Sequence, residues 1–314
     1  MNPPRRLVVG AGGLSALILA CAVGPWLLPS LGNGDPIHAA LLPPGTAVTV
    51  FELADGRTLV SSEVSRDAES IHLRGRRRTT VVPLDDVRSE RRARLWLGSD
   101  RFGRDLLPRL LRGGRISLAI AVAGVLVALI VGLGVGLAAA TGGRLADGVL
   151  MRLVDALLAF PLLFLLILVA ALFRPGPGLL ILVLGLSSWM GLARLVRGQV
   201  LSLRSRAFIQ AARVAGTPPL RIWTLHYLPN LRAPLAQDTA LRMGDLVLAE
   251  ATLSFLGLGI PPNLPSWGSM IAQGQRVMID GWWLSVFPGL AIAALVISLA
   301  LIGDGMQQVG EASG

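Results

Sequence analysis

Runs of about twenty apolar residues recur along the chain and are separated by shorter polar segments. A helix of that length crosses the hydrocarbon core of a bilayer, which is about 30 Å thick. Six runs qualify, at residues 7–28, 116–141, 149–173, 179–200, 235–258 and 283–302. The third and fourth are separated at 174–178, where two prolines remove backbone donors and two glycines permit a reversal. The pattern predicts an all-α polytopic membrane protein with six transmembrane helices.

A segment between the first two runs has a different period. From Thr46 onward β-rich runs alternate with turns, and Asp55-Gly56 between two such runs is a strong hairpin signal. We predict an N-terminal transmembrane anchor at 1–33, a small external β-rich insert at 34–96 and a membrane domain at 97–314. Whether the insert is a spacer resting on the membrane domain or contacts a partner stays open.

The distribution of arginine predicts the orientation in the membrane, because short loops rich in arginine favour the cytoplasmic side. Residues 194–232 hold seven arginines and no acid, whereas residues 259–282 hold only Arg276 and Asp280. The connection between the fourth and fifth helices is therefore expected in the cytoplasm, together with both termini. The 15 arginines of residues 34–115 would then lie outside, against the rule, although the rule weakens for loops longer than about 60 residues.

Composition excludes several kinds of chemistry. The chain of 314 residues is 53% hydrophobic and 15% charged, with a net charge of +10. One cysteine and three histidines exclude a disulfide framework and make a metal centre improbable. There is no P-loop and no lysine, so this chain is not expected to bind ATP that way. The basic run at 74–78 lacks interleaved aromatic residues, which indicates a solvated face and not a nucleic-acid site.

The fifth apolar run contains Asp238, Arg242, Asp245 and Glu250. Charge at membrane depth is costly unless it is paired or faces water. Asp238 and Arg242 are four residues apart and can pair on one helix. We take Arg242, Asp245 and Glu250 as candidate residues of a solute pathway. For Glu250 two interpretations stay open, a position on an aqueous path and a buried carboxyl held by neighbouring helices.

The segment 207–230 predicts a compact helical projection between the fourth and fifth helices. Residues 207–215 are good helix formers, and Gly216 can supply a left-handed C-terminal cap. Thr217 is expected to cap a second short helix, with Pro218 and Pro219 in its first turn. We call residues 204–232 the knob.

The knob resembles the cytoplasmic coupling loop of bacterial ABC importer permeases, whose motif has Glu-Ala-Ala followed by a glycine and a later hydrophobic and proline pair. The matching residues here are Gln210, Ala211, Ala212, Gly216, Leu220, Ile222 and Pro229. Gln210 stands where the family usually has glutamate, which puts any charged contact at that position in question.

Other stretches are similar to the dipeptide/oligopeptide/nickel permease family, in particular its second permease subunit. They include LGSDRFGRD at 97–105, VDALLAFP at 154–161, LAEATLSFLGLG at 248–259, PSWG at 265–268 and GDG at 303–305. The likeness covers residues 97 to 305. Asp245 in place of a small residue and the charged insert depart from the family pattern.

The resemblance implies a type I ABC importer permease in the bacterial inner membrane. Such a chain forms half of a translocation pathway for peptides, nickel or another small solute and has no catalytic residues. Its implied partners are a second permease in a heterodimer, two cytoplasmic subunits that carry ATP and Mg, and an external solute-binding protein. The resemblance also gives the knob the role of docking on the ATPase subunits.

Three alternatives stay open. Pro265, Trp267 and Gly268 lie in the last external loop, which either shapes a gate, meets the binding protein or forms a re-entrant scaffold that packs on the other permease. A secondary carrier driven by an ion gradient and a membrane enzyme are the other functional classes. A carrier usually has internal repeats and an enzyme needs a nucleophile with a base, and neither stands out in the sequence.

Overall fold

A computed structural model describes residues 4–28, 34–75, 78–161, 164–165, 168–169, 172–173, 176–261 and 264–312. The chain divides into two compact units. Unit 1 comprises Met1–Leu17, Ser117–Pro261 and Ile292–Gly314, and unit 2 comprises Ile18–Ile116 and Pro262–Ala291. Three long helices contribute residues to both units, namely α1 (Arg5–Leu27), α2 (Leu106–Thr141) and α10 (Trp283–Ala312).

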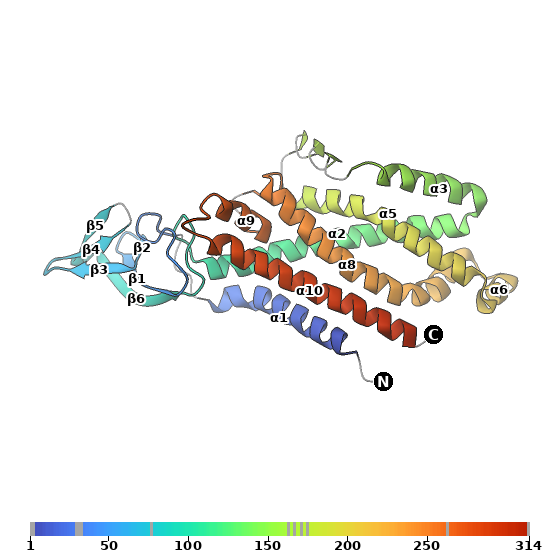
Figure 1. Ribbon diagram of the computed structural model, residues 1–314, viewed down its shortest axis with the longest axis horizontal. Coiled ribbons are helices and arrows are strands. Elements are labelled where there is room, and N and C mark those ends of the chain that lie inside the picture. The colour runs from blue at the N-terminus through green and yellow to red at the C-terminus, as the bar shows by residue number, and fades with distance from the viewer. Residues whose placement is uncertain are drawn as a thin grey trace. The chain divides into compact units, whose positions relative to one another are not determined.

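Unit 1 is helical (Figure 1). Besides its parts of α1, α2 and α10 it contains α3 (Gly143–Leu158), α5 (Pro177–Arg204), α6 (Ala207–Val214), α7 (Pro219–Ile222) and α8 (Leu228–Phe255). A π-helical turn, Trp223–Tyr227, joins α7 to α8. Close contacts join α5 to α8 and α3 to α5.

Small residues on α2 bring its backbone against α5. A Cβ atom on Gly136 would lie 2.7 Å from the carbonyl oxygen of Ala193, and one on Gly132 would lie 2.9 Å from that of Trp189. Ala128 and Ala140, on the same face of α2, are buried. This spacing of four residues lets helices approach closely without the hydrophobic effect that drives packing in water.

The first turns of α1 pack on the last turns of α10. A Cβ atom on Gly10 would meet the carbonyl oxygen of Ser298 at 2.7 Å, and one on Gly305 would meet the Leu7 backbone at 2.8 Å. The side chains of Arg6 and Asp304 form an exposed ion pair at 3.3 Å. The N-terminal and C-terminal helices therefore form one packed pair within unit 1.

Unit 2 contains two antiparallel three-stranded sheets. One has the order β2-β1-β6, from Thr58–Ser61, Thr46–Leu53 and Val87–Leu95, and the other has the order β3-β4-β5, from Glu63–Arg66, Ser70–Arg74 and Thr79–Pro83. Phe51 and Leu53 of β1 pack on Ile71 and Leu73 of β4. The Asp55-Gly56 turn lies between β1 and β2, with Gly56 at φ +82°.

A buried polar chain ties the segment before β1 to both sheets. The carboxylate of Asp35 lies 2.8 Å from Nδ1 of His38 and accepts the backbone N–H of Val60 at 3.1 Å. The other ring nitrogen of His38 lies 2.8 Å from the hydroxyl of Thr80. Both ring nitrogens of this buried histidine thus have partners, as buried polar groups require.

The turn that leads into α2 is organised by two aspartates. Asp100 is buried, accepts the backbone N–H groups of Phe102 and Arg104, and pairs with the guanidinium groups of Arg104 and Arg109. Among the residues that the structure describes, the Asp105 carboxylate accepts one hydrogen bond, from the backbone N–H of Leu107 at 3.0 Å. Burial raises the pKa of Asp105, and the hydrogen bond from Leu107 lowers it. The effect of burial is larger, so the pKa is about 6.

Four helices of the described chain have the length and apolar composition of a membrane span, namely Arg5–Leu27, Leu106–Thr141, Pro177–Arg204 and Trp283–Gln308. They correspond to four of the six predicted spans. Most of the fifth predicted span lies in α8, a 28-residue helix whose five charged side chains lower its hydropathy. The third predicted span, residues 149–173, begins in α3, and several of its later residues lie outside the described part of the chain. The six-helix arrangement thus stays a prediction.

Replacing Gly136 by alanine should lower the free energy of unfolding by about 1–3 kcal/mol, because the added methyl group overlaps the α5 backbone. Gly134→Ala is the matched control, since a Cβ atom there meets nothing within 4 Å. The melting temperatures of the two variants, measured on the detergent-solubilised chain, report the change in stability. Equal stability of the two variants would contradict the close approach of α2 and α5.

Stability should fall as the pH rises from about 4 to about 6, because in this range the unfolded chain has lost the Asp105 proton and the folded protein still holds it; above about 6 the loss levels off. Asp105→Asn keeps an acceptor for Leu107 without the charge. Its melting temperature should rise progressively above that of the unmodified chain from about pH 4 to about pH 6, and the difference should stay nearly constant at higher pH. Asp55→Asn, at the exposed β1–β2 turn, is the control. An Asp105→Asn curve that parallels the unmodified one would refute this account.

Candidate functional site

The knob is built around a left-handed glycine. Gly216 has φ +72°, and its N–H bonds to the carbonyl of Arg213 while the N–H of Thr217 bonds to the carbonyl of Ala212. This pair of bonds is a Schellman motif, which closes α6. The predicted break at Gly216 is therefore present.

The predicted cap at Thr217 is wrong. Pro218 is the N-cap of α7, Pro219 follows in its first turn, and no side chain caps this helix. The reason is that the backbone N–H of Thr217 already closes α6, so the residue belongs to the end of the first helix.

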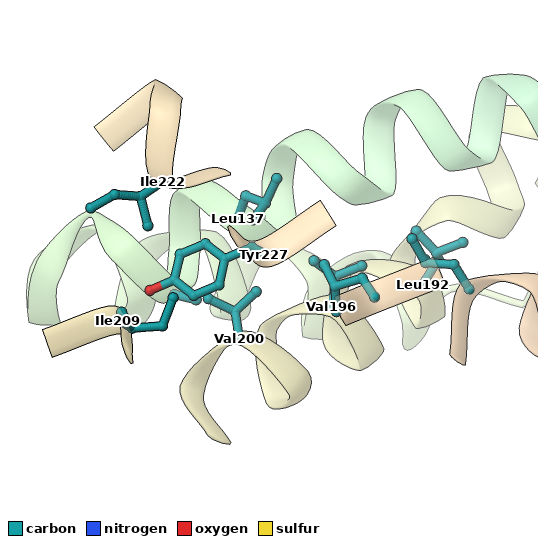
Figure 2. Packing of buried hydrophobic residues seen from close by; sticks show 10 residues of the cluster. Leu137, Leu192, Val196, Val200, Ile209, Ile222 and Tyr227 are labelled. Carbon is teal, nitrogen blue, oxygen red and sulfur yellow. The ribbon is translucent and has the colours of Figure 1, made fainter. Parts of the chain in front are cut away.

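Buried side chains seat the knob on the long helices of unit 1. Ile209 of α6, Ile222 of α7 and Tyr227 of the π-turn are at most 5% exposed. Figure 2 shows their side chains gathered with Leu137 of α2 and Val200 of α5. Ala140, Leu192, Val196, Leu231 and Leu235 complete the cluster. We call these ten residues the seat. It joins α2, α5 and α8 to both short helices, so the knob is packed as part of the helical body.

An open cavity of about 340 Å³ lies beside the seat. Thr141 at the end of α2 and Arg213 of α6 contribute polar groups to it, and Pro218, Ile222 and Trp223 line it with apolar surface. The guanidinium of Arg213 donates to the hydroxyl of Tyr227 at 3.3 Å.

The remaining motif residues of the knob are exposed or half-buried. Gln210, Ala211 and Leu220 are exposed, and Ala212 is half-buried. The side-chain amide of Gln210 donates to the carbonyl of Ser205 at 3.3 Å. Pro229 is half-buried in the first turn of α8. The motif thus combines residues that anchor the knob, such as Ile222, with residues that are free to meet a partner.

The predicted pair on α8 is confirmed. Arg242 binds both carboxylate oxygens of Asp238 and also donates to the carbonyl of Ser188 on α5 at 2.7 Å. Gly191 makes room for it, because a Cβ atom there would lie 2.9 Å from the guanidinium. Asp245 is exposed on the surface of the chain. A pathway role for Arg242 and Asp245 stays a prediction.

Glu250 of α8 is fully buried where this helix meets α2. Its carboxylate accepts the hydroxyl of Ser117 at 2.9 Å and that of Ser254 at 2.7 Å. The backbone N–H of Ile260 lies 3.4 Å from the Ser254 hydroxyl, so the chain after α8 joins the same network. In this arrangement Glu250 holds α2 and α8 together. A role on a solute path stays a prediction.

The predicted external loop contains a helix, α9 (Trp267–Gln275), in unit 2. Ser266 and Ser269 form a reciprocal capping box that starts it. Trp267 and Gly268 are buried and Pro265 is half-buried. The indole N–H of Trp267 donates to the carbonyl of Leu110 in the second turn of α2. These contacts lie within one chain; a gating role stays a prediction.

Two further groups of residues escaped the sequence analysis. The first is the seat, above all Ile209 and Tyr227, whose apolar character in a basic segment was the available signal. The second group forms two ion pairs between α3 and α5. Asp155 binds Arg194, and Asp147 binds Arg197.

No group of three or more histidine, cysteine or acidic side chains that could hold a metal ion occurs within the part of the chain that the structure describes.

Comparison with known proteins identifies the family. Residues 130–312 match the family described as binding-protein-dependent transport system inner membrane component. A putative peptide transport system permease of Brucella suis is 44% identical over 212 residues, covering 68% of this chain and 71% of the relative. The di/tripeptide permease DppC of Pseudomonas aeruginosa is 38% identical with the same coverage of both chains, and the oligopeptide permease OppC of Haemophilus influenzae is 37% identical with 68% coverage of both.

A solved structure of the MetNI methionine ABC transporter shares the fold. The match covers 67% of this chain and 98% of the transporter chain, with a TM-score of 0.54 and a sequence identity of 20%. Family match, sequence relatives and fold agree, and the chain belongs to the family of binding-protein-dependent transport system inner membrane components.

Proposed function

We propose that this chain is a permease subunit of an ATP-driven importer and forms half of a translocation pathway for peptides or a related small solute. The observation that carries the proposal is the seat, which joins a helical projection with an exposed outer face to three long helices. Peptide cargo is supported by the names of the relatives from three bacteria. A secondary carrier or an enzyme has no comparable support.

Transport requires partners in this proposal. A second permease completes the pathway, two cytoplasmic ATPase subunits bind ATP and Mg, and an external binding protein delivers the solute. The knob and both chain termini lie on the cytoplasmic side, and the strands of unit 2 lie outside. This orientation follows the excess of arginine in residues 194–232.

Coupling follows from packing. When the ATPase subunits close, they displace the knob, and the seat transmits this displacement to α2, α5 and α8. Close-packed interiors transmit strain because they resist compression. The helices then tilt as a body between inward-open and outward-open states. Glu250 keeps α2 with α8 during this movement through its two serine partners.

Uptake into proteoliposomes tests the function. The chain is purified with its copurifying partners, and the vesicles are loaded with ATP and Mg. Labelled di- and tripeptides, or nickel in a parallel assay, are added outside with the binding protein. Uptake should require ATP and persist when ion gradients are collapsed. Uptake that follows an ion gradient without ATP would instead establish a carrier.

Ile209→Ala should uncouple transport from ATP hydrolysis, because the cavity it leaves loosens the knob from the helices. Uptake per ATP hydrolysed should fall roughly 5- to 30-fold, the factor for 1–2 kcal/mol of lost coupling. Simultaneous measurement of peptide uptake and phosphate release in the proteoliposomes gives this ratio.

Leu182→Ala on α5 is the control, because it removes the same kind of side chain from an exposed position. The ratio of uptake to hydrolysis should not change in that variant. An unchanged ratio in a normally assembled Ile209→Ala complex would show that the seat does not transmit the movement.

A further inference from the structure

The outer surface of the knob carries charge of one sign. Arg206, Arg213 and Arg221 are exposed, and no acidic residue occurs between residues 194 and 232. Within the described chain, the guanidinium groups of Arg206 and Arg221 make no hydrogen bond or ion pair, although the backbones of both residues are hydrogen-bonded. Arg213 bonds to the hydroxyl of Tyr227, a neutral partner.

The neighbouring arginines of α5 are treated differently by the fold. Arg194 pairs with Asp155 and Arg197 pairs with Asp147, both on α3. The chain therefore neutralises these two arginines of α5 and leaves those of the knob without a carboxylate partner among the described residues. Gln210 occupies the usual glutamate position, and its amide is engaged by the carbonyl of Ser205. The knob thus offers a partner positive charge and no negative charge.

Apolar side chains accompany these arginines. Val214 is 89% exposed and Leu220 is 69% exposed, and Phe208 and Leu225 are also exposed. Arginine and large apolar residues together are typical of a protein interface. Because a guanidinium binds carboxylates through two parallel hydrogen bonds, the complementary surface should be acidic. The cavity beside Arg213 gives an acidic side chain room to enter.

We propose that the ATPase subunit presents an acidic surface to the knob, with carboxylates opposite Arg206, Arg213 and Arg221. This inference rests on the proposed function and names the chemistry of one partner. In this proposal the permease and the ATPase subunit recognise each other through attraction between the arginines of the knob and carboxylates of the ATPase subunit.

Binding of the ATPase subunits measures this attraction. The chain and its partner permease are placed in nanodiscs of uncharged phosphatidylcholine, and the copurifying ATPase subunits are titrated. Neutralising both unpaired arginines, in Arg206→Gln with Arg221→Gln, should raise the dissociation constant about tenfold. Affinity of the unmodified pair should also fall more steeply with salt than that of the double variant. Arg221→Lys should lose less affinity than Arg221→Gln, because it keeps the charge but not the paired hydrogen bonds, and Arg221→Glu should lose more than Arg221→Gln.

Arg144→Gln is the matched control, because Arg144 is an exposed arginine in the first turn of α3, outside the knob. It should bind the ATPase subunits normally. An unchanged dissociation constant for the double variant would overturn the proposal. So would a loss that occurs only in nanodiscs with anionic phosphatidylglycerol and that Arg144→Gln shares, since the arginines would then serve lipid headgroups. If the unmodified pair bound no ATPase subunit, the proposed function itself would fail.

Discussion

The packing of Ile209, Ile222 and Tyr227 against α2, α5 and α8 is the constraint on which the function of this chain depends. A projection joined to the membrane helices by flexible loops would move without them. Here the two short helices share one buried cluster with three long ones. Gly216 makes this possible, because its left-handed backbone reverses the chain between α6 and α7 and lets both Ile209 and Ile222 reach the same cluster.

The long helices move together only if they are joined to each other, and three different interactions join them. Small residues bring α2 against α5, Arg242 ties α8 to the Ser188 carbonyl of α5, and Glu250 ties α8 to Ser117 of α2. Two of the three use polar groups. Inside a membrane an unsatisfied polar group is costly, so each of these contacts disfavours separation of the helices it joins.

Local signals predicted local features of this fold. The Asp55-Gly56 turn, the glycine break in the knob and the Asp238–Arg242 pair each depend on residues within a few positions of one another. The small residues of α2 also carry a local signal, because they recur every four residues along the sequence. The seat was not predictable. The sequence indicates that residues such as Tyr227 are apolar enough to be buried, but it does not show which helices they pack against. α9 was missed because its cap uses two serines in a loop dominated by proline and tryptophan, and Thr217 was misassigned because its backbone completes the preceding helix.

Distances between spin labels test the rigid connection most directly. Labels are attached through Val214→Cys on the knob and Leu186→Cys on α5, both exposed positions, after Cys21 is replaced. The assembled complex is measured by pulsed electron resonance without nucleotide and with bound ATP. The account predicts one narrow distance distribution that stays the same in both states, while distances from α5 to the partner permease change. A distribution that shifts or broadens when ATP binds would contradict it, because the knob would then move independently of the helices that it is proposed to drive.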